Sequence, residues 1–469
     1  MNIILIILDS LRKDCIGAYG APPWWKVHTP HLDRFAAESM LFTRVYPETL
    51  PTLPARRAIY TGKRVYPGGS SIYRLKGDFG GGPGWGPIPE ELDTLAELLR
   101  ERGGYRTALI SDLYHMFKPS KNFWRGFDQW TFLRGQETDP CRSGPQPTQR
   151  VLDYWLAPEL QTSERLDFLS KCLRNMYGRE KEEDYFNARV FIEAARWLEQ
   201  NRDADKFFLT VESFDPHEPW FVPGYYRQMY DPSEGQEHVI SLYGPAEQLN
   251  ASLLSRMRAN YSGLVTMCDR WFGYFFEALR NTGLLEDTAV FVTSDHGHSL
   301  GDNGYIGKQG YPSGPEVFDI PLLIRHPEGT GAGHRCDHFI QHHDIPAQIL
   351  EFAGVEPAQP LDGKTFWQAA MDRDKSYRNH VTASFPHGVT VINDHWWYNS
   401  KIDGRSVFLY DMTSLEPFAC NVADDHREVV HDLYHLALED AGGSFPEQLL
   451  QFAADHADAP GCSPLAAFE

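Results

Sequence analysis

The sequence predicts an α/β protein with a mostly parallel, doubly wound sheet and a small α+β subdomain near its C-terminal end. The first observation is residues 2–8, an uninterrupted apolar run that is typical of a parallel strand buried on both faces. The second is the alternation of strand-like and helix-like segments through the first 375 residues. The third is a change of pattern at about residue 376, after which short strand-like segments follow one another.

The predicted large domain spans residues 1–375, and its elements follow from changes in hydrophobic periodicity. In chain order we expect strand 2–8, helix 29–37, a helix beginning at 56–61, helix 92–102, strand 105–110, helix 186–201, strand 207–211, helix 254–280, strand 289–293, strand 320–325 and helix 345–353. Residues 67–89 are rich in Gly and Pro and are expected to form a loop at the rim of the site. Residues 118–185 are polar and are expected to be an irregular insertion that covers it.

The predicted subdomain spans residues 376–469. Here the alternation of strands and helices gives way to short consecutive strands, which predict a small sheet. Its expected strands are 380–383, 388–392, 395–400 and 407–411. One helix, residues 429–438, is expected to close it.

The amino-acid composition argues against several classes of binding partner. Lys plus Arg is 44 and Asp plus Glu is 64, so the net charge is 44 − 64 = −20. So acidic a surface repels nucleic acid and anionic lipid, and no apolar run reaches the roughly 20 residues that span a membrane. The seven scattered cysteines, without a CxxC pair, favour reduced thiols, and residues 1–9 lack the features of a signal peptide. We therefore expect a cytoplasmic protein that captures a small anion in a local cationic pocket.

A metal site is predicted where polar residues follow apolar strands. Asp9 ends the first strand, and Asp295 and His296 end a strand nearly 300 residues later. Strand ends of one sheet converge at one edge, where open α/β sheets bind ligands. Mixed carboxylate and imidazole ligands suit Mn, Zn or Fe better than Ca or Mg. The alternative for Asp9 alone is a helix cap.

Thr52 is the predicted nucleophile. A threonine hydroxyl needs a base or a metal to attack an ester, and a helix beginning just behind it would direct its N–H groups toward an anion. Arg56 would lie one turn along on the same face and could bind an anionic oxygen with two donors. The alternative is that Thr52 only caps this helix.

Several stretches, in order, resemble the sulfatase branch of the alkaline phosphatase superfamily. They are Thr52-Leu-Pro-Ala-Arg56, Ala58-Ile-Tyr-Thr-Gly62, Gly104-Tyr-Arg-Thr-Ala108, Asp215-Pro-His217, Ser294-Asp-His-Gly297 with Lys308, Ile320-Pro-Leu-Leu-Ile-Arg325, Asp344-Ile-Pro with Ala353-Gly, and Leu409-Tyr-Asp-Met with Asn421. The resemblance covers nearly the whole chain. It implies an alkaline-phosphatase-like α/β/α sandwich and a hydrolase of small anionic esters.

The resemblance also implies roles for single residues. Asp9, Thr52, Asp295 and His296 would bind one divalent metal ion, and Arg56 would support the nucleophile and the bound anion. Lys308 and His217 would hold the ester group, with His217 the better candidate for the general acid. The alternatives are a surface-turn histidine for His217 and a solvated loop lysine for Lys308.

Four departures from the sulfatase pattern bear on the chemistry. Thr52 stands where sulfatases have the Cys or Ser that becomes formylglycine, and Thr cannot form that aldehyde. Ser10 replaces a second Asp, and His296 replaces the Asn of calcium-dependent members, which favours a softer metal. Residues 111–115 replace Gly-Lys-Trp-His, which removes a lysine and leaves His115 as a candidate substrate-binding residue.

These observations support three hypotheses. The first is a single-metal phosphodiesterase or phosphonate monoester hydrolase in which Thr52 attacks phosphorus. The second is a sulfatase that works without formylglycine. The third is a catalytically silent protein that keeps the metal and anion pocket. The sequence leaves the physiological substrate and the oligomeric state open, a homo-oligomer included.

Overall fold

The computed structural model describes residues 1–67, 82–118, 120–372, 377–385 and 388–455. Its centre is an eight-stranded sheet, in which every strand except β10 runs in the same direction. In spatial order the strands are β11 (Arg335–Gln341), β2 (Met40–Tyr46), β10 (Leu322–Arg325), β7 (Thr288–Thr293), β1 (Asn2–Leu8), β5 (Phe207–Ser213), β3 (Arg106–Ser111) and β4 (Gln129–Phe132). The predicted α/β class with a mostly parallel sheet is confirmed.

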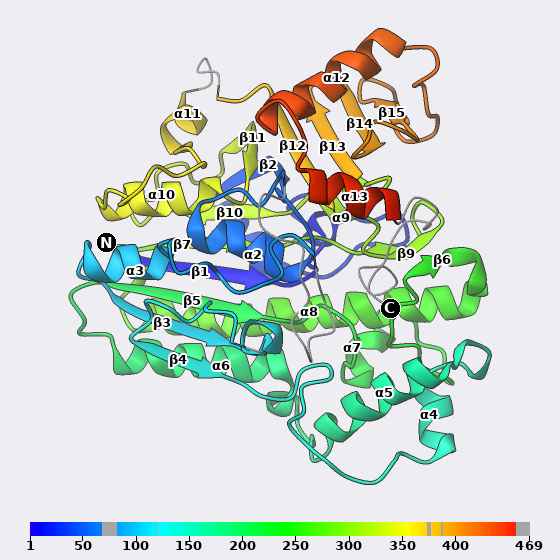
Figure 1. The fold of residues 1–469 in the computed structure, drawn as a ribbon. Coiled ribbons are helices and arrows are strands. Elements are labelled where there is room, and N and C mark those ends of the chain that lie inside the picture. Colours follow the sequence, from blue (N-terminus) through cyan, green and yellow to red (C-terminus); the bar gives the residue numbers. More distant parts are fainter. Residues whose placement is uncertain (68–81, 119, 373–376, 386–387, 456–469) are drawn as a thin grey trace.

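Helices cover both faces of this sheet (Figure 1). One face carries α1 (Pro30–Ala37), α6 (Phe186–Gln200) and α8 (Ala251–Asn281). The other carries α2 (Thr52–Thr61), α3 (Leu95–Glu101), α10 (Asp344–Ala353) and α11 (Trp367–Met371). Because successive side chains of a strand point to opposite faces, the apolar run of β1 divides evenly between the two cores: 4, 6 and 8 on the α8 side, and 3, 5 and 7 on the α2 side.

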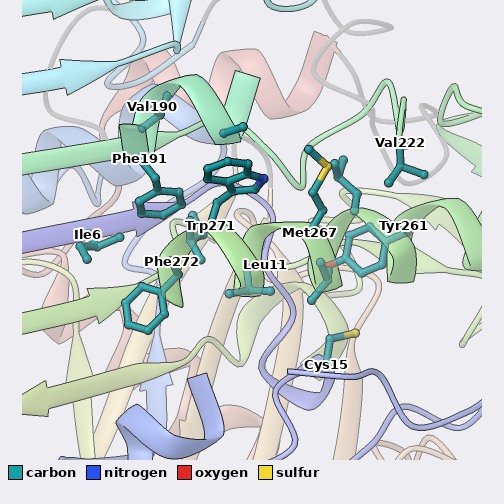
Figure 2. Packing of buried hydrophobic residues seen from close by; sticks show 14 of the residues in the cluster. Ile6, Leu11, Cys15, Val190, Phe191, Val222, Tyr261, Met267, Trp271 and Phe272 are labelled. Atoms are coloured by element: carbon teal, nitrogen blue, oxygen red, sulfur yellow. The ribbon is translucent and has the colours of Figure 1, made fainter. Parts of the chain in front are cut away.

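The α8 side of the core combines aliphatic side chains such as Ile6 and Leu11 with aromatic rings such as Phe191 and Phe272 (Figure 2). Phe272 of α8 makes an edge-to-face contact with Phe35 of α1, with ring centroids 5.3 Å apart, and Phe191 of α6 lies against the same helix. Such contacts hold α6 and α8 tightly against β1 and so fix the strand ends that carry the polar residues.

The C-terminal sheet is antiparallel and consists of β12 (His380–Phe385), β13 (Gly388–Asn393), β14 (Trp396–Lys401) and β15 (Phe408–Asp411). One face packs on α12 (Arg427–Asp440), and the other packs on residues of the large domain such as Tyr46 and Phe318. A further helix, α13 (Glu447–Asp455), follows, so the expectation of one closing helix was wrong. The predicted boundary at 375/376 lies outside the described residues.

The segment 118–185 is more regular than predicted. It contributes the edge strand β4 and the helices α4 (Gln149–Trp155) and α5 (Ser163–Met176). Strands β2 and β11 were also missed, because polar residues interrupt the apolar pattern of both. Most of the predicted glycine loop, residues 68–81, lies outside the described residues.

Shorter elements complete the fold. A small sheet joins β6 (Gly244–Pro245), β9 (Tyr305–Gly307) and β8 (Ser299–Leu300), and the short helices are α7 (Gly224–Gln228) and α9 (Pro315–Phe318). None of the described helices is both long enough and apolar enough for a membrane span. The six cysteines in the described part of the chain form no disulfide.

Candidate active site

Three neighbouring parallel strands, β7, β1 and β5, carry acidic residues at their carboxyl ends. Ile7 of β1 pairs with Glu212 of β5 on one side and with Thr293 of β7 on the other. This register brings Asp9, Glu212 and Asp295 to the same edge of the sheet. Together with Arg56 and His296 they form what we call the strand-end cluster.

Asp9, Asp295 and His296 each offer one ligand atom, and these atoms all lie within 4.8 Å of one another. All three residues are fully buried. Within the described residues, His296 Nε2 has no hydrogen-bond partner, and Asp9 Oδ2 has none beside its ionic contact with Arg56 Nη1 at 3.1 Å. Buried polar atoms without partners are costly, so their convergence fits a metal site. The helix-cap alternative for Asp9 is not supported, because its Oδ1 accepts from the Ser10 hydroxyl instead.

Ser10 orients both carboxylates. Its hydroxyl donates to Asp9 Oδ1 at 2.9 Å, and its backbone N–H donates to Asp295 Oδ1 at 3.0 Å. Ser10 adopts the left-handed region at φ +61°, which is uncommon for a residue with a Cβ. Both Oδ1 atoms are thereby occupied, and the two Oδ2 atoms, which contact Arg56 Nη1, are the ones that would be shared with a cation. Where sulfatases have a further Asp ligand, this chain has a residue that holds the other ligands in place.

Arg56 links the nucleophile helix to the carboxylates. Its Nη1 lies 2.5 Å from Asp295 Oδ2, 3.1 Å from Asp9 Oδ2 and 3.1 Å from the Thr52 carbonyl oxygen. Its Nε donates to Glu212 Oε2 at 2.6 Å. The Nη2 group is buried without a hydrogen-bond partner in the described structure, which leaves one donor for an anion.

Thr52 is the first residue of α2 and is buried. Pro51 precedes it, and no side chain caps the helix, so the alternative that Thr52 acts only as the cap is not supported. The contact of its carbonyl with Arg56 places it beside the strand-end cluster. The first N–H groups of α2 stay available to an anion there.

The pKa values of Asp295 and His296 suit metal binding, and that of Asp9 reflects two buried carboxylates held close together. Burial and the neighbouring Asp295 raise the pKa of Asp9 well above its ordinary value. Burial alone would raise the pKa of Asp295 too, but attraction to His296 and Arg56 lowers it below its ordinary value. Burial lowers the pKa of His296 to about 3. His296 is therefore neutral near pH 7, the form in which an imidazole binds a metal.

A second group of side chains, the loop cluster, comprises His217, Glu218, Tyr243, His298 and Lys308. Lys308 Nζ lies 2.6 Å from His217 Nε2, and both residues are about 4 % exposed. The alternatives of a surface-turn histidine and a solvated lysine are therefore wrong. Burial and the charge of Lys308 lower the pKa of His217 well below its ordinary value, so its imidazole is neutral at pH 7.

His115 lies apart from both clusters. It is buried, and its Nε2 lies 3.0 Å from Glu137 Oε2. The ring of Phe214 contacts His115 on one side and stacks on His217 on the other, with centroids 6.0 and 4.0 Å apart. A role of His115 in binding substrate stays a prediction.

Sequence reasoning missed Glu212, Glu218, Tyr243 and His298. A signal existed for Glu212, because it is the one acidic residue inside the otherwise apolar and hydroxyl-bearing strand β5. Another existed for Glu218, which follows His217 directly. Tyr243 and His298 carried no such signal, because only the tertiary structure brings their loops together.

A family model described as Sulfatase matches residues 1–355 of the chain. Among curated proteins, the chain is 28 % identical over 407 residues to the "Multifunctional alkaline phosphatase superfamily protein PehA" of Trinickia caryophylli, which covers 78 % of this chain and 76 % of that protein. It is 24 % identical over 433 residues to an arylsulfatase of Clostridium perfringens, which covers 85 % and 86 %.

Solved structures show the same fold. The phosphonate monoester hydrolase of Agrobacterium radiobacter superposes with a TM-score of 0.72 at 22 % identity, covering 96 % of this chain and 97 % of the other. The phosphonate monoester hydrolase of Silicibacter pomeroyi gives 0.73 at 21 % identity, covering 96 % of each. The predicted alkaline-phosphatase-like fold is thereby confirmed.

Proposed function

Because the chain belongs to the sulfatase family of hydrolases, we propose that it cleaves phosphodiesters or phosphonate monoesters with Thr52 as the nucleophile. The observation that carries the proposal is the position of Thr52. It begins α2 beside an otherwise complete set of Arg56, Asp9, Asp295 and His296. Thr cannot be converted to formylglycine, whereas a phosphorylated threonine is an intermediate that water can clear at phosphorus.

Asp9, Asp295 and His296 would hold the divalent metal ion that this family binds, with Thr52 as the proposed fourth ligand. A cation there would lower the pKa of a bound hydroxyl and balance negative charge on the ester oxygens. The mixed oxygen and nitrogen donors favour Mn, Zn or Fe over Ca or Mg. Arg56 would direct its unpaired Nη2 toward an ester oxygen.

The geometry favours Lys308 over His217 as the proton donor. His217 Nδ1 lies 2.5 Å from the carbonyl oxygen of Glu218, which can only accept, so Nδ1 carries the proton. Neutral His217 then has no proton at Nε2 and accepts from the Lys308 ammonium. Lys308 has further N–H groups for the leaving oxygen. We therefore assign the role of general acid to Lys308, and we assign to His217 the role of holding the Lys308 ammonium in place.

The reaction would proceed in two displacements at phosphorus. Thr52, whose hydroxyl proton would be released to solvent when a cation binds, bonds as the alkoxide to phosphorus while the bond to the leaving oxygen breaks. The leaving oxygen keeps the electron pair of that bond and takes a proton from Lys308. Water then attacks the phosphothreonine and gives a proton to the Lys308 amine, and the Thr52 oxygen departs. The second step returns the enzyme to its starting state.

The test compares matched p-nitrophenyl esters on Mn- or Zn-loaded protein: phosphodiester, phosphonate monoester, phosphate monoester and sulfate. We expect turnover of the first two, with a loss of about 10³-fold or more in Thr52→Ala while the metal content is retained. Thr61→Ala is the matched control, because Thr61 is a buried threonine at the other end of α2 whose hydroxyl bonds only to nearby backbone, donating to the Arg57 carbonyl and accepting from the Lys63 N–H. Undiminished turnover in Thr52→Ala would overturn the assignment.

A second candidate is a sulfate ester hydrolase that acts without formylglycine. The match to the sulfatase family model and to an arylsulfatase favours it. Sulfate turnover equal to or above that of the phosphodiester would replace the first proposal by this one. Silence on all four esters with metal bound would support a catalytically silent homologue.

A further inference from the structure

Glu218 has a carboxylate at the centre of the loop cluster. Its side chain is buried, and Oε1 accepts a hydrogen bond from the Tyr243 hydroxyl. The other oxygen, Oε2, lies 3.3 Å from His217 Nδ1 and 3.6 Å from His298 Nδ1. Within the described residues, Oε2 has no hydrogen-bond partner. Burying a carboxylate charge without a hydrogen-bond partner costs desolvation free energy, and such groups are often found at functional sites.

The carboxylate and the carbonyl of Glu218 both face the same proton. The carbonyl oxygen accepts from His217 Nδ1 at 2.5 Å, and Oε2 approaches that nitrogen from 3.3 Å. The hydrogen bond to the carbonyl and the nearby carboxylate charge both favour a proton at Nδ1, which holds the ring in one tautomer and one orientation. The opposite nitrogen, Nε2, then presents its lone pair to Lys308 at 2.6 Å.

Tyr243 holds the carboxylate by a hydrogen bond, and the ring of His298 lies next to it. His298 Nε2 lies 3.0 Å from the Ser241 hydroxyl, and its ring packs edge-on against Trp220. Tyr243 comes from the loop before β6 and His298 from the loop before β8. Glu218 is thus held in place by loops that the small sheet brings together.

We propose that Glu218 is a positioning residue that acts through His217 to hold the Lys308 ammonium at the leaving oxygen, which makes the site one for esters of unactivated alcohols. This inference rests on the proposed function. In this arrangement the side chains of Glu218, His217, Tyr243 and His298 surround or support the Lys308 ammonium, which would donate the proton. A phenolate such as p-nitrophenolate departs without a proton, whereas an alkoxide needs one.

The test is Glu218→Gln, which keeps the shape and an acceptor for Tyr243 but removes the negative charge. Turnover of a p-nitrophenyl ester and of an alkyl ester of the same phosphorus acid is compared, using methyl p-nitrophenyl phosphate and dimethyl phosphate. We expect kcat to change about threefold or less on the first and to fall about 100-fold on the second, with KM nearly constant on both.

Glu237→Gln is the matched control, because Glu237 is another buried carboxylate, paired with Arg227 and Arg256 away from the loop cluster. It should lower both rates by one common factor or leave both unchanged. If Glu218→Gln behaves in the same way, the inference is overturned. Tyr243→Phe removes only the hydroxyl that holds Oε1, and it should shift the ratio of the two rates in the same direction by a smaller factor.

The failures of the two proposals differ. A wild-type enzyme that turns over neither ester overturns the proposed function and this inference together. A wild-type enzyme that turns over the aryl ester but shows equal losses on both esters in Glu218→Gln overturns only the role of Glu218.

Discussion

The strand-end cluster and the loop cluster differ in how they are supported. In the strand-end cluster, Arg56 lies on α2 and the other residues lie on or shortly after β1, β5 and β7, the middle strands of the sheet. The residues of the loop cluster lie in the connection that follows β5 and in the loops around β6, β8 and β9. The first cluster is charged, with Arg56 in contact with three carboxylates. The second holds one carboxylate, one ammonium and neutral imidazoles. The strand-end cluster thus rests on the sheet and would hold the cation, whereas the loop cluster is arranged around the proton of Lys308.

The difference has an energetic consequence. Burying the strand-end charges costs desolvation energy that only mutual pairing offsets, so removing one partner should be destabilising. The loop cluster instead depends on hydrogen-bond direction, so changes there should alter rate and leaving-group preference more than folding. The predictions below test this contrast.

The largest effect is expected for Asp295→Asn. It removes a proposed metal ligand and weakens the 2.5 Å contact with Arg56. Turnover should fall about 10³-fold or more, and bound metal measured by elemental analysis should drop to a small fraction of the wild-type amount. Asp344→Asn is the control. Asp344 is a buried aspartate at the start of α10, and its ion-pair partner is Arg378. Full metal content in Asp295→Asn would contradict the assignment of this ligand.

A smaller effect, on stability, is expected for Glu212→Gln. Glu212 accepts from Arg56 Nε and from the Tyr60 hydroxyl, and all three side chains are buried. Without its charge, Arg56 keeps only the two aspartates, and the free energy of unfolding should fall by about 3 kcal/mol. Denaturant unfolding of metal-free protein measures this directly. A loss below about 1 kcal/mol would mean that the strand-end cluster is not held together by charge, and the comparison would fail.

The smallest effect is expected for Asp112→Asn. The Asp112 carboxylate accepts from the Phe214 N–H and from Gln136. Asp112 and Asp215 share the amide of Gln136, and burial together with repulsion from Asp215 raises the pKa of Asp112 to about 7, while burial raises that of Asp215 to about 6. A raised carboxyl pKa stabilises the folded state below about pH 4, and that contribution is lost as the pH rises through 6–7.

Asp112→Asn removes one titrating group. Its unfolding free energy should therefore decline less between pH 5 and pH 8 than that of the wild type, by about 1–3 kcal/mol. Unfolding curves at several pH values measure the two slopes. Parallel curves would show that Asp112 does not titrate in this range.

Much of the fold was predictable because its signals are local. The apolar run of β1 and the 3.6-residue periodicity of α8 follow from the chain itself, and both elements form close to where they were expected. Strands β2 and β11 were not predictable in this way. Polar side chains such as Arg44 and Asp337 interrupt their apolar patterns, and partner strands supply the stabilisation instead.

In the candidate site, too, some residues were predictable from the sequence and others were not. Asp9, Asp295 and His296 were predicted to converge because polar residues that follow buried parallel strands emerge at one edge of a sheet, and the structure brings them together. The sequence by itself also determined that a threonine begins the helix behind them. The tertiary structure alone decided that Glu212 binds Arg56, and that Glu218, Tyr243 and His298 surround His217. Strand ends inherit their positions from backbone pairing, which periodicity reveals. Contacts between loops depend on how distant segments pack, and no local pattern in the chain encodes that.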